Sequence, residues 1–168
     1  MLVVAAFLDT VLAGDPANAS GELDLIRSAL AESDAEAVAA LLDKIPGDAT
    51  EAMTGVLRDI GDISTEVPEV DVSVMQWSLN EQIRFMAALA AGAVVSEAAS
   101  AFILEAMQPI DEQRWGLGTI TDGPFKGGWL DADTVTRQMG IVDGYAFHGE
   151  PSVKSGGVVY EGDPSMRG

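Results

Sequence analysis

The sequence contains no cysteine and a single histidine, His148. The lack of cysteine excludes disulfide bridges, thiolate zinc sites and a cysteine nucleophile. One histidine cannot form a histidine cluster around a metal, so carboxylates are the only metal ligands left, and we expect neither a metal nor a cofactor. His148 stands at the end of a predicted strand with no serine or aspartate pattern beside it, which favours a surface or capping residue over a general base.

Basic residues are also scarce, since nine lysines and arginines stand against 27 aspartates and glutamates, for a net charge of −18. Such a charge repels nucleic acid and anionic membrane surfaces, so we expect no nucleic-acid partner. No run approaches the ~20 apolar residues that a membrane span needs. Met1 to Leu8 is apolar, but no basic residue precedes it and Asp9 interrupts it. We therefore expect no secretion signal, and the sequence leaves the localisation open.

Apolar residues are plentiful and make up 48% of the 168 residues. A chain of this length buries about 70% of its unfolded surface as one domain. In the first 108 residues the apolar positions recur every three or four residues, with capping serines such as Ser33, Ser78 and Ser96 before them and Gly61 and Gly92 after them. This spacing predicts five or six helices within residues 1–13, 20–30, 33–45, 53–60, 78–92 and 96–107.

Beyond Pro109 the texture changes to spaced glycines, β-branched residues and aromatics, which is typical of strands and hairpins. We expect strands within residues 113–120, 125–130 and 135–147. From Gly149 onward Gly, Pro and Ser dominate, which predicts a weakly ordered tail over 149–168. The expected organisation is one domain over 1–148, mainly helical over 1–108 and stranded over 109–148. Its class is α/β in the α+β form, a helical region joined to a partial antiparallel sheet.

The segment from Trp115 to Gly118, followed by Lys126-Gly127-Gly128, carries a resemblance to a known family. It resembles the class A β-lactamase-like and penicillin-binding serine hydrolases of actinobacterial type, in which a Lys-[Ser/Thr]-Gly triplet lies on the strand beside the active site. The resemblance implies that Lys126 supplies positive potential for a substrate carboxylate, and that Gly128 lets the ligand lie against the strand. The N–H of Trp129 would face an oxyanion. Gly127 departs from the pattern because it lacks the hydroxyl.

Upstream, Ser33-Asp34-Ala35 resembles the family's Ser-Asp-Asn element, whose serine mediates proton transfer and whose asparagine amide binds the substrate. Ala35 cannot supply that amide. A purely structural interpretation competes here, because Ser33 and Glu36 also form a capping box. The resemblance implies Ser33 and Lys126 as catalytic residues, and as substrate-binding residues Asp34, Gly127, Gly128 and Trp129.

The nucleophile motif of the family, Ser-x-x-Lys, is absent from the sequence, and so is a Gly-x-Ser-x-Gly elbow. In the family the serine and lysine open an apolar helix like residues 1–13. Past Tyr145 the family continues into a last strand and a C-terminal helix, which residues 147–168 do not resemble. We therefore expect a partial β-lactamase-like domain that is truncated at both ends. Its exposed sheet edge predicts self-association.

Two further patterns are weaker. No Glu-x-x-Leu-Asn element of the kind that deacylates in the family occurs between Gly61 and Trp77, so Glu66 and Glu69 are only positional candidates and are expected to be exposed loop carboxylates. Residues 154–156 fit Lys-[Ser/Thr]-Gly by letters, but Pro151 precedes them and no alternating strand leads into them, so the earlier triplet is preferred.

The first function hypothesis is a β-lactamase-like serine hydrolase, acting on β-lactams or cell-wall peptides by acyl transfer but inactive as written. The second is a non-catalytic ligand-binding or structural module on the same fold. Both imply a β-lactam or peptidoglycan-type small ligand. A third, a plain helical interaction protein, requires that no sheet forms.

Overall fold

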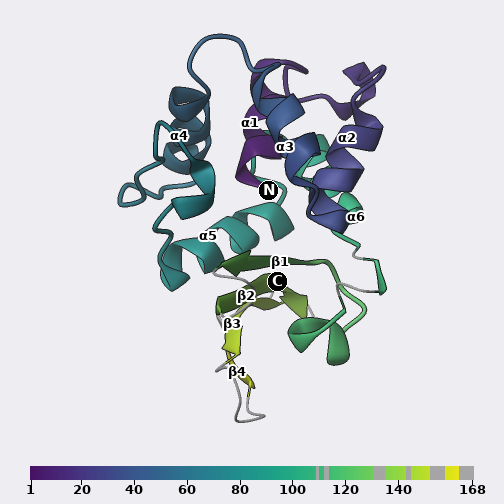
Figure 1. Cartoon of the computed structure of the whole chain (residues 1–168), viewed down its shortest axis with the longest axis vertical. Coiled ribbons are helices and arrows are strands. Elements are labelled where there is room, and N and C mark those ends of the chain that lie inside the picture. The colour runs from purple at the N-terminus through teal and green to yellow at the C-terminus, as the bar shows by residue number, and fades with distance from the viewer. Residues whose placement is uncertain (109, 112–113, 131–134, 143–144, 152–157, 163–168) are drawn as a thin grey trace.

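The computed structural model describes residues 1–108, 110–111, 114–130, 135–142, 145–151 and 158–162, and places a helical region on top of an antiparallel sheet (Figure 1). The helices are α1 (Leu2–Thr10), α2 (Leu23–Arg27), α3 (Ala35–Leu42), α4 (Ala49–Asp59), α5 (Leu79–Ala90) and α6 (Glu97–Ala106). Short helical turns are η1 (Pro16–Asn18), η2 (Ser28–Glu32), η3 (Val72–Val74) and η5 (Gly116–Thr119). The strands are β1 (Phe125–Leu130), β2 (Val135–Val142), β3 (Tyr145–Pro151) and β4 (Val158–Gly162). The predicted fold class, helices followed by an antiparallel sheet, is confirmed.

Helix α1 is the centre of the helical region. Every residue from Leu2 to Leu8 is buried, so the helix is apolar on all sides, as expected for a helix enclosed by others. It packs against α3, α4 and α6. Within the described residues, no helix is long and apolar enough to cross a membrane.

The sheet has the strand order β1-β2-β3-β4 with every pair antiparallel, which leaves β1 at one edge. Helix α5 covers one face of it (Figure 1). On that face Met139 and Ile141 of β2 pack against the main core. On the opposite face Phe125 of β1 and Leu117 of η5 are buried. Because side chains alternate along a strand, Lys126 points toward the helical region.

Two segments differ from the sequence-based expectation. The strand predicted within residues 113–120 is wrong, because residues 116–119 form the helical turn η5, in which Gly116 adopts a positive φ of 50°. Strand β4 pairs with β3 inside the segment 149–168, for which the sequence predicted a weakly ordered tail.

Serine caps are partly confirmed. Ser78 Oγ accepts a hydrogen bond from the N–H of Glu81, and Ser96 Oγ accepts one from the N–H of Ala99. The capping role predicted for Ser33 is wrong. Asp34 caps α3 instead, since its carboxylate accepts hydrogen bonds from the first backbone N–H groups of that helix.

We predict that Asp34→Ala lowers the free energy of unfolding by about 1 kcal/mol, because it removes this cap. Asp34→Asn keeps an oxygen acceptor and is expected to cost little. Urea unfolding of both variants measures the difference. Equal losses in the two variants would show that the charge of Asp34, and not its capping oxygen, stabilises α3.

Candidate active site

The two predicted catalytic residues come together although 93 positions separate them. Lys126 Nζ donates a hydrogen bond to Ser33 Oγ. The same ammonium donates to the carbonyl oxygen of Gly127 at 2.7 Å. Strand β1 carries the lysine and the segment between η2 and α3 carries the serine, so this contact joins the sheet to the helical region.

The local backbone explains why the Ser33 hydroxyl is available to Lys126. The π-helical turn η2 ends at Ser33, which lies in the left-handed region with φ 61° and ψ 33°. A residue other than glycine pays about 1–2 kcal/mol for this conformation. Asp34 takes over the capping of α3, with its Oδ1 2.8 Å from the N of Glu36 and 3.2 Å from the N of Ala37. The serine hydroxyl is therefore not needed by the helix.

Burial lowers the pKa of Lys126 to about 8, because desolvation disfavours the ammonium. The amino group of Met1 has its pKa lowered to about 5, first by burial and then by the positive charge of Lys126. The turn at Ser33 and β1 meet at the site.

The other predicted site residues have different surroundings. Among the described residues, no heavy atom beyond the chain neighbours of Gly128 lies within 4 Å of where its Cβ would be. This glycine is on the same strand face as Lys126, so it borders open space beside the lysine. Trp129 pairs with Thr136 through the backbone, and its side chain lies outside the described residues. Asp34 faces the backbone of α3, as its cap.

The weaker candidates do not join this cluster. Glu66 and Glu69 are exposed, in agreement with the prediction. Their loop is fixed by Asp62, whose Oδ1 accepts from the N–H of Thr65 at 2.9 Å. His148 lies on β3 opposite Met139, and its side chain is outside the description. The rival triplet at residues 154–156 also lies outside the described residues.

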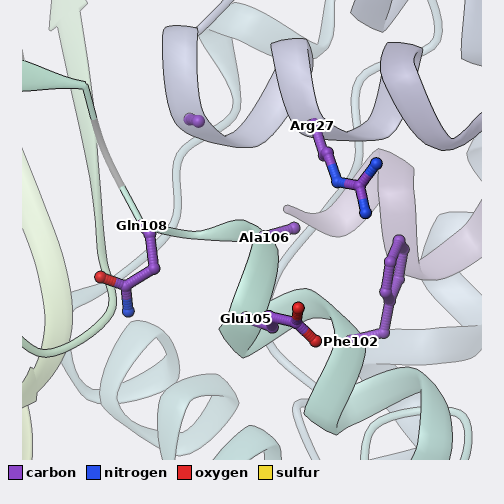
Figure 2. Close-up of a pocket in the computed structure, with 6 residues that line it drawn as sticks. Arg27, Phe102, Glu105, Ala106 and Gln108 are labelled. Carbon is purple, nitrogen blue, oxygen red and sulfur yellow. The ribbon is translucent and has the colours of Figure 1, made fainter.

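A separate cavity of about 210 Å³ lies between the α2–η2 segment and α6 (Figure 2). In Figure 2 the Arg27 side chain extends from one helix toward the ring of Phe102 on the other. None of the predicted site residues lines it, although Ala31, one of its lining residues, is two positions from Ser33. In the described part of the chain no group of three or more acidic or histidine residues is placed to hold a metal ion.

One buried residue near the site escaped the sequence analysis. Gln138 of β2 is 1% exposed and lies opposite Gly127 in the strand register. In the sequence it is a polar residue that follows Thr136 and Arg137 in the strand, and such a residue is easily interpreted as solvent-facing.

The lowered pKa of Lys126 predicts a specific dependence of stability on pH. The folded pKa, about 8, is below the ordinary value of 10.5. Between these values the unfolded chain binds more protons, so stability rises as the pH rises through this window. Below pH 8 the buried charge costs a constant amount, of roughly 2 kcal/mol after allowance for partial exposure.

We therefore expect Lys126→Met to be more stable than the parent chain at pH 7, by roughly that amount. The difference should shrink between pH 8 and pH 10.5. Urea unfolding of both proteins at several pH values measures it. A difference that stays constant over this range would mean that Lys126 keeps its ordinary pKa.

Comparisons with known proteins bear on the fold. No family model and no curated protein matches the sequence. Among solved structures, a mutant of the chromosome-encoded β-lactamase of Vibrio parahaemolyticus matches with a TM-score of 0.65 at 17% identity, over 95% of this chain and 71% of that chain. A likeness at this identity concerns the fold alone. The chain therefore has a β-lactamase-like fold.

Proposed function

We propose that this chain is a β-lactamase-like serine hydrolase family member, of actinobacterial type, whose Lys126–Ser33 site binds a β-lactam or a cell-wall peptide. We further propose that it completes no acyl transfer as written. The observation that carries the proposal is the hydrogen bond between Lys126 Nζ and Ser33 Oγ, which joins two separately predicted motifs. The β-lactamase-like fold supports the same assignment.

The chemistry of the two residues fits a ligand that carries a carboxylate. At pH 7 Lys126, with a pKa of about 8, is mainly an ammonium and attracts an anion. In a chain of net charge −18, a buried cation is the feature that would draw an anionic group inward. Charge-assisted hydrogen bonds of this kind are about twice as strong as neutral ones.

Ser33 suits proton transfer. Its hydroxyl accepts from Lys126 and keeps its own proton to donate to a ligand atom. A lysine with a pKa near the working pH exchanges protons easily, so the pair suits a short proton relay. The Ser33 side chain is held for this task by the left-handed backbone and not by a capping bond.

The proposed lack of acyl transfer rests on the missing nucleophile. No serine in the sequence is followed three residues later by a lysine. Without this pair the chain lacks the nucleophile on which the family forms its acyl-enzyme, and the proposal gives Ser33 the role of proton transfer instead. Glu66 and Glu69 are exposed and lie in a loop without the Glu-x-x-Leu-Asn element, so neither is assigned the deacylating role.

The second candidate function is a non-catalytic ligand-binding module on the same fold. The open space beside Gly128 favours it, because a ligand can lie along β1 there without covalent chemistry. The two functions share one site and differ in whether a covalent bond forms, so one pair of experiments separates them.

The first experiment tests covalency. We expect incubation with a fluorescent penicillin, followed by denaturing electrophoresis and intact mass, to give no adduct, because the chain holds no Ser-x-x-Lys. A known penicillin-binding enzyme serves as the positive control for the probe. A stoichiometric adduct would overturn the claim that acyl transfer is not completed.

The second experiment tests reversible binding of benzylpenicillin and of a muropeptide by calorimetry. Lys126→Ala is expected to weaken binding by about ten- to hundredfold, since it removes a charge-assisted hydrogen bond. Gly128→Ala is expected to weaken it by about tenfold, since its methyl group fills ligand space and clashes with nothing described in the free protein.

Lys44→Ala is the matched control for the charge. Lys44 pairs with Glu22 at 3.3 Å on the surface, and its loss should leave affinity unchanged. Absence of binding by the parent chain to both ligands would refute the proposed function. If Lys44→Ala and Lys126→Ala lose equal affinity, the loss in Lys126→Ala comes from the net charge of the chain and not from a contact with the ligand.

A further inference from the structure

We infer that Gln138 is a positioning residue for this site. It fixes the turn η5 to the face of the sheet opposite Ser33, and through that turn it holds the strand that carries Lys126 and Gly128. The link to a ligand rests on the proposed function, whereas the link to the position of β1 does not.

Within the described residues, the Gln138 amide makes two hydrogen bonds, both to the backbone of one turn. Its Oε1 accepts from the N–H of Leu117 at 2.6 Å, and its Nε2 donates to the carbonyl of Trp115 at 2.8 Å. The side chain is 1% exposed, and Leu117 is fully buried. A buried amide that pairs a donor and an acceptor of one backbone segment fixes its position and orientation together.

Glycines make room for this arrangement. In the strand register the two cross-strand neighbours of Gln138 are Gly127 on β1 and Gly149 on β3. Directly opposed side chains have Cβ atoms only about 4.5–5.5 Å apart, so two glycines free the space around the amide. A third glycine lets the turn approach β1 closely. A Cβ at Gly118 would lie 2.7 Å from the ring of Phe125, so only glycine fits there without a shift of that ring.

Strand β1 needs support from this face. It is an edge strand, so β2 is its only strand partner in the described sheet. Gly127 and Gly128 give it no side chains to pack at the site, and glycine weakens a strand interior. The turn η5 contacts β2, and its Gly118 lies against Phe125, the first residue of β1. Loss of the Gln138 hydrogen bonds to the turn would therefore loosen β1, the strand that sets where Lys126 meets Ser33.

Gln138→Met tests this directly, because methionine is similar in size and cannot make either hydrogen bond. The matched control is Gln82→Met. Gln82 is 5% exposed and its Nε2 also donates to a tryptophan carbonyl, that of Trp77, at 2.7 Å. Gln82 lies on α5. Both variants therefore lose a buried amide, but only Gln138→Met loses one that lies next to β1 in the sheet.

The readouts need no ligand. We expect Gln138→Met to shift the backbone amide signals of Gly127 and Gly128 in NMR spectra. We also expect the measured pKa of Lys126 to rise from about 8 toward 10.5, as water reaches a loosened strand. Gln82→Met should change neither. Unchanged glycine signals in Gln138→Met, with changed signals at Leu117, would overturn the proposal.

Gln138→Glu adds a reversible test that remains available if the methionine variant does not fold. A protonated glutamate accepts from Leu117 and donates to Trp115 as the amide does, whereas the carboxylate cannot donate. On the turn side, Arg114 precedes Trp115 and forms ion pairs with Asp111 and Asp122. Burial at this position raises the pKa of the introduced carboxyl group, so the protonated form is expected at pH 5 and the carboxylate at pH 8. The Gly127 and Gly128 signals should therefore match those of the parent at pH 5, and at pH 8 they should not.

If the Gly127 and Gly128 signals of Gln138→Glu differ from those of the parent at pH 5, the positioning role of Gln138 is wrong. A binding measurement then connects it to function, since Gln138→Met should lower benzylpenicillin affinity by about tenfold or more while Gln82→Met does not. If the parent chain binds no ligand, the proposed function fails while the NMR tests still decide the role of Gln138. The two failures are thus distinguishable.

Discussion

The hydrogen bond from Lys126 to Ser33 is the constraint on which the rest of the site depends. A lysine is costly to bury, and a lowered pKa is the sign of that cost. Among the described residues, the hydroxyl of Ser33 and the carbonyl of Gly127 accept hydrogen bonds from the ammonium, which offsets part of this cost. The helical region and the sheet therefore meet at a polar contact, while apolar packing under α5 supplies the bulk of their attachment.

This contact assigns different tasks to two adjacent residues. If Ser33 capped α3, its hydroxyl would point at the helix backbone and Lys126 would lose an acceptor. With Asp34 as the cap, the helix end is satisfied by the carboxylate. The left-handed backbone at Ser33 then turns its side chain away from the helix, at a cost of about 1–2 kcal/mol. Strained backbone at a site that joins distant segments is a common feature of functional sites.

Much of the fold could be predicted from local pattern. The bounds of β1 coincide with the predicted strand at residues 125–130, and Ser78 and Ser96 cap helices as expected. The failures occur where distant contacts decide. Ser33-Asp34 offers two possible caps, and the choice is tied to Lys126, 93 positions away from Ser33. The glycines and aromatics near Trp115 are typical of strands, yet they form a turn because Gln138, 21 positions from Leu117, binds its backbone.

The same reasoning explains the departure from the Lys-[Ser/Thr]-Gly pattern at Gly127. On β1 this residue shares its strand face with Gln138, directly across the register. A serine or threonine there would place its side chain beside a buried amide that already uses an oxygen and a nitrogen to hold η5. The lack of a side chain at Gly127 therefore leaves the space that the buried Gln138 amide occupies. Lys126, on the other face of β1, is the strand's polar side chain toward the helical region.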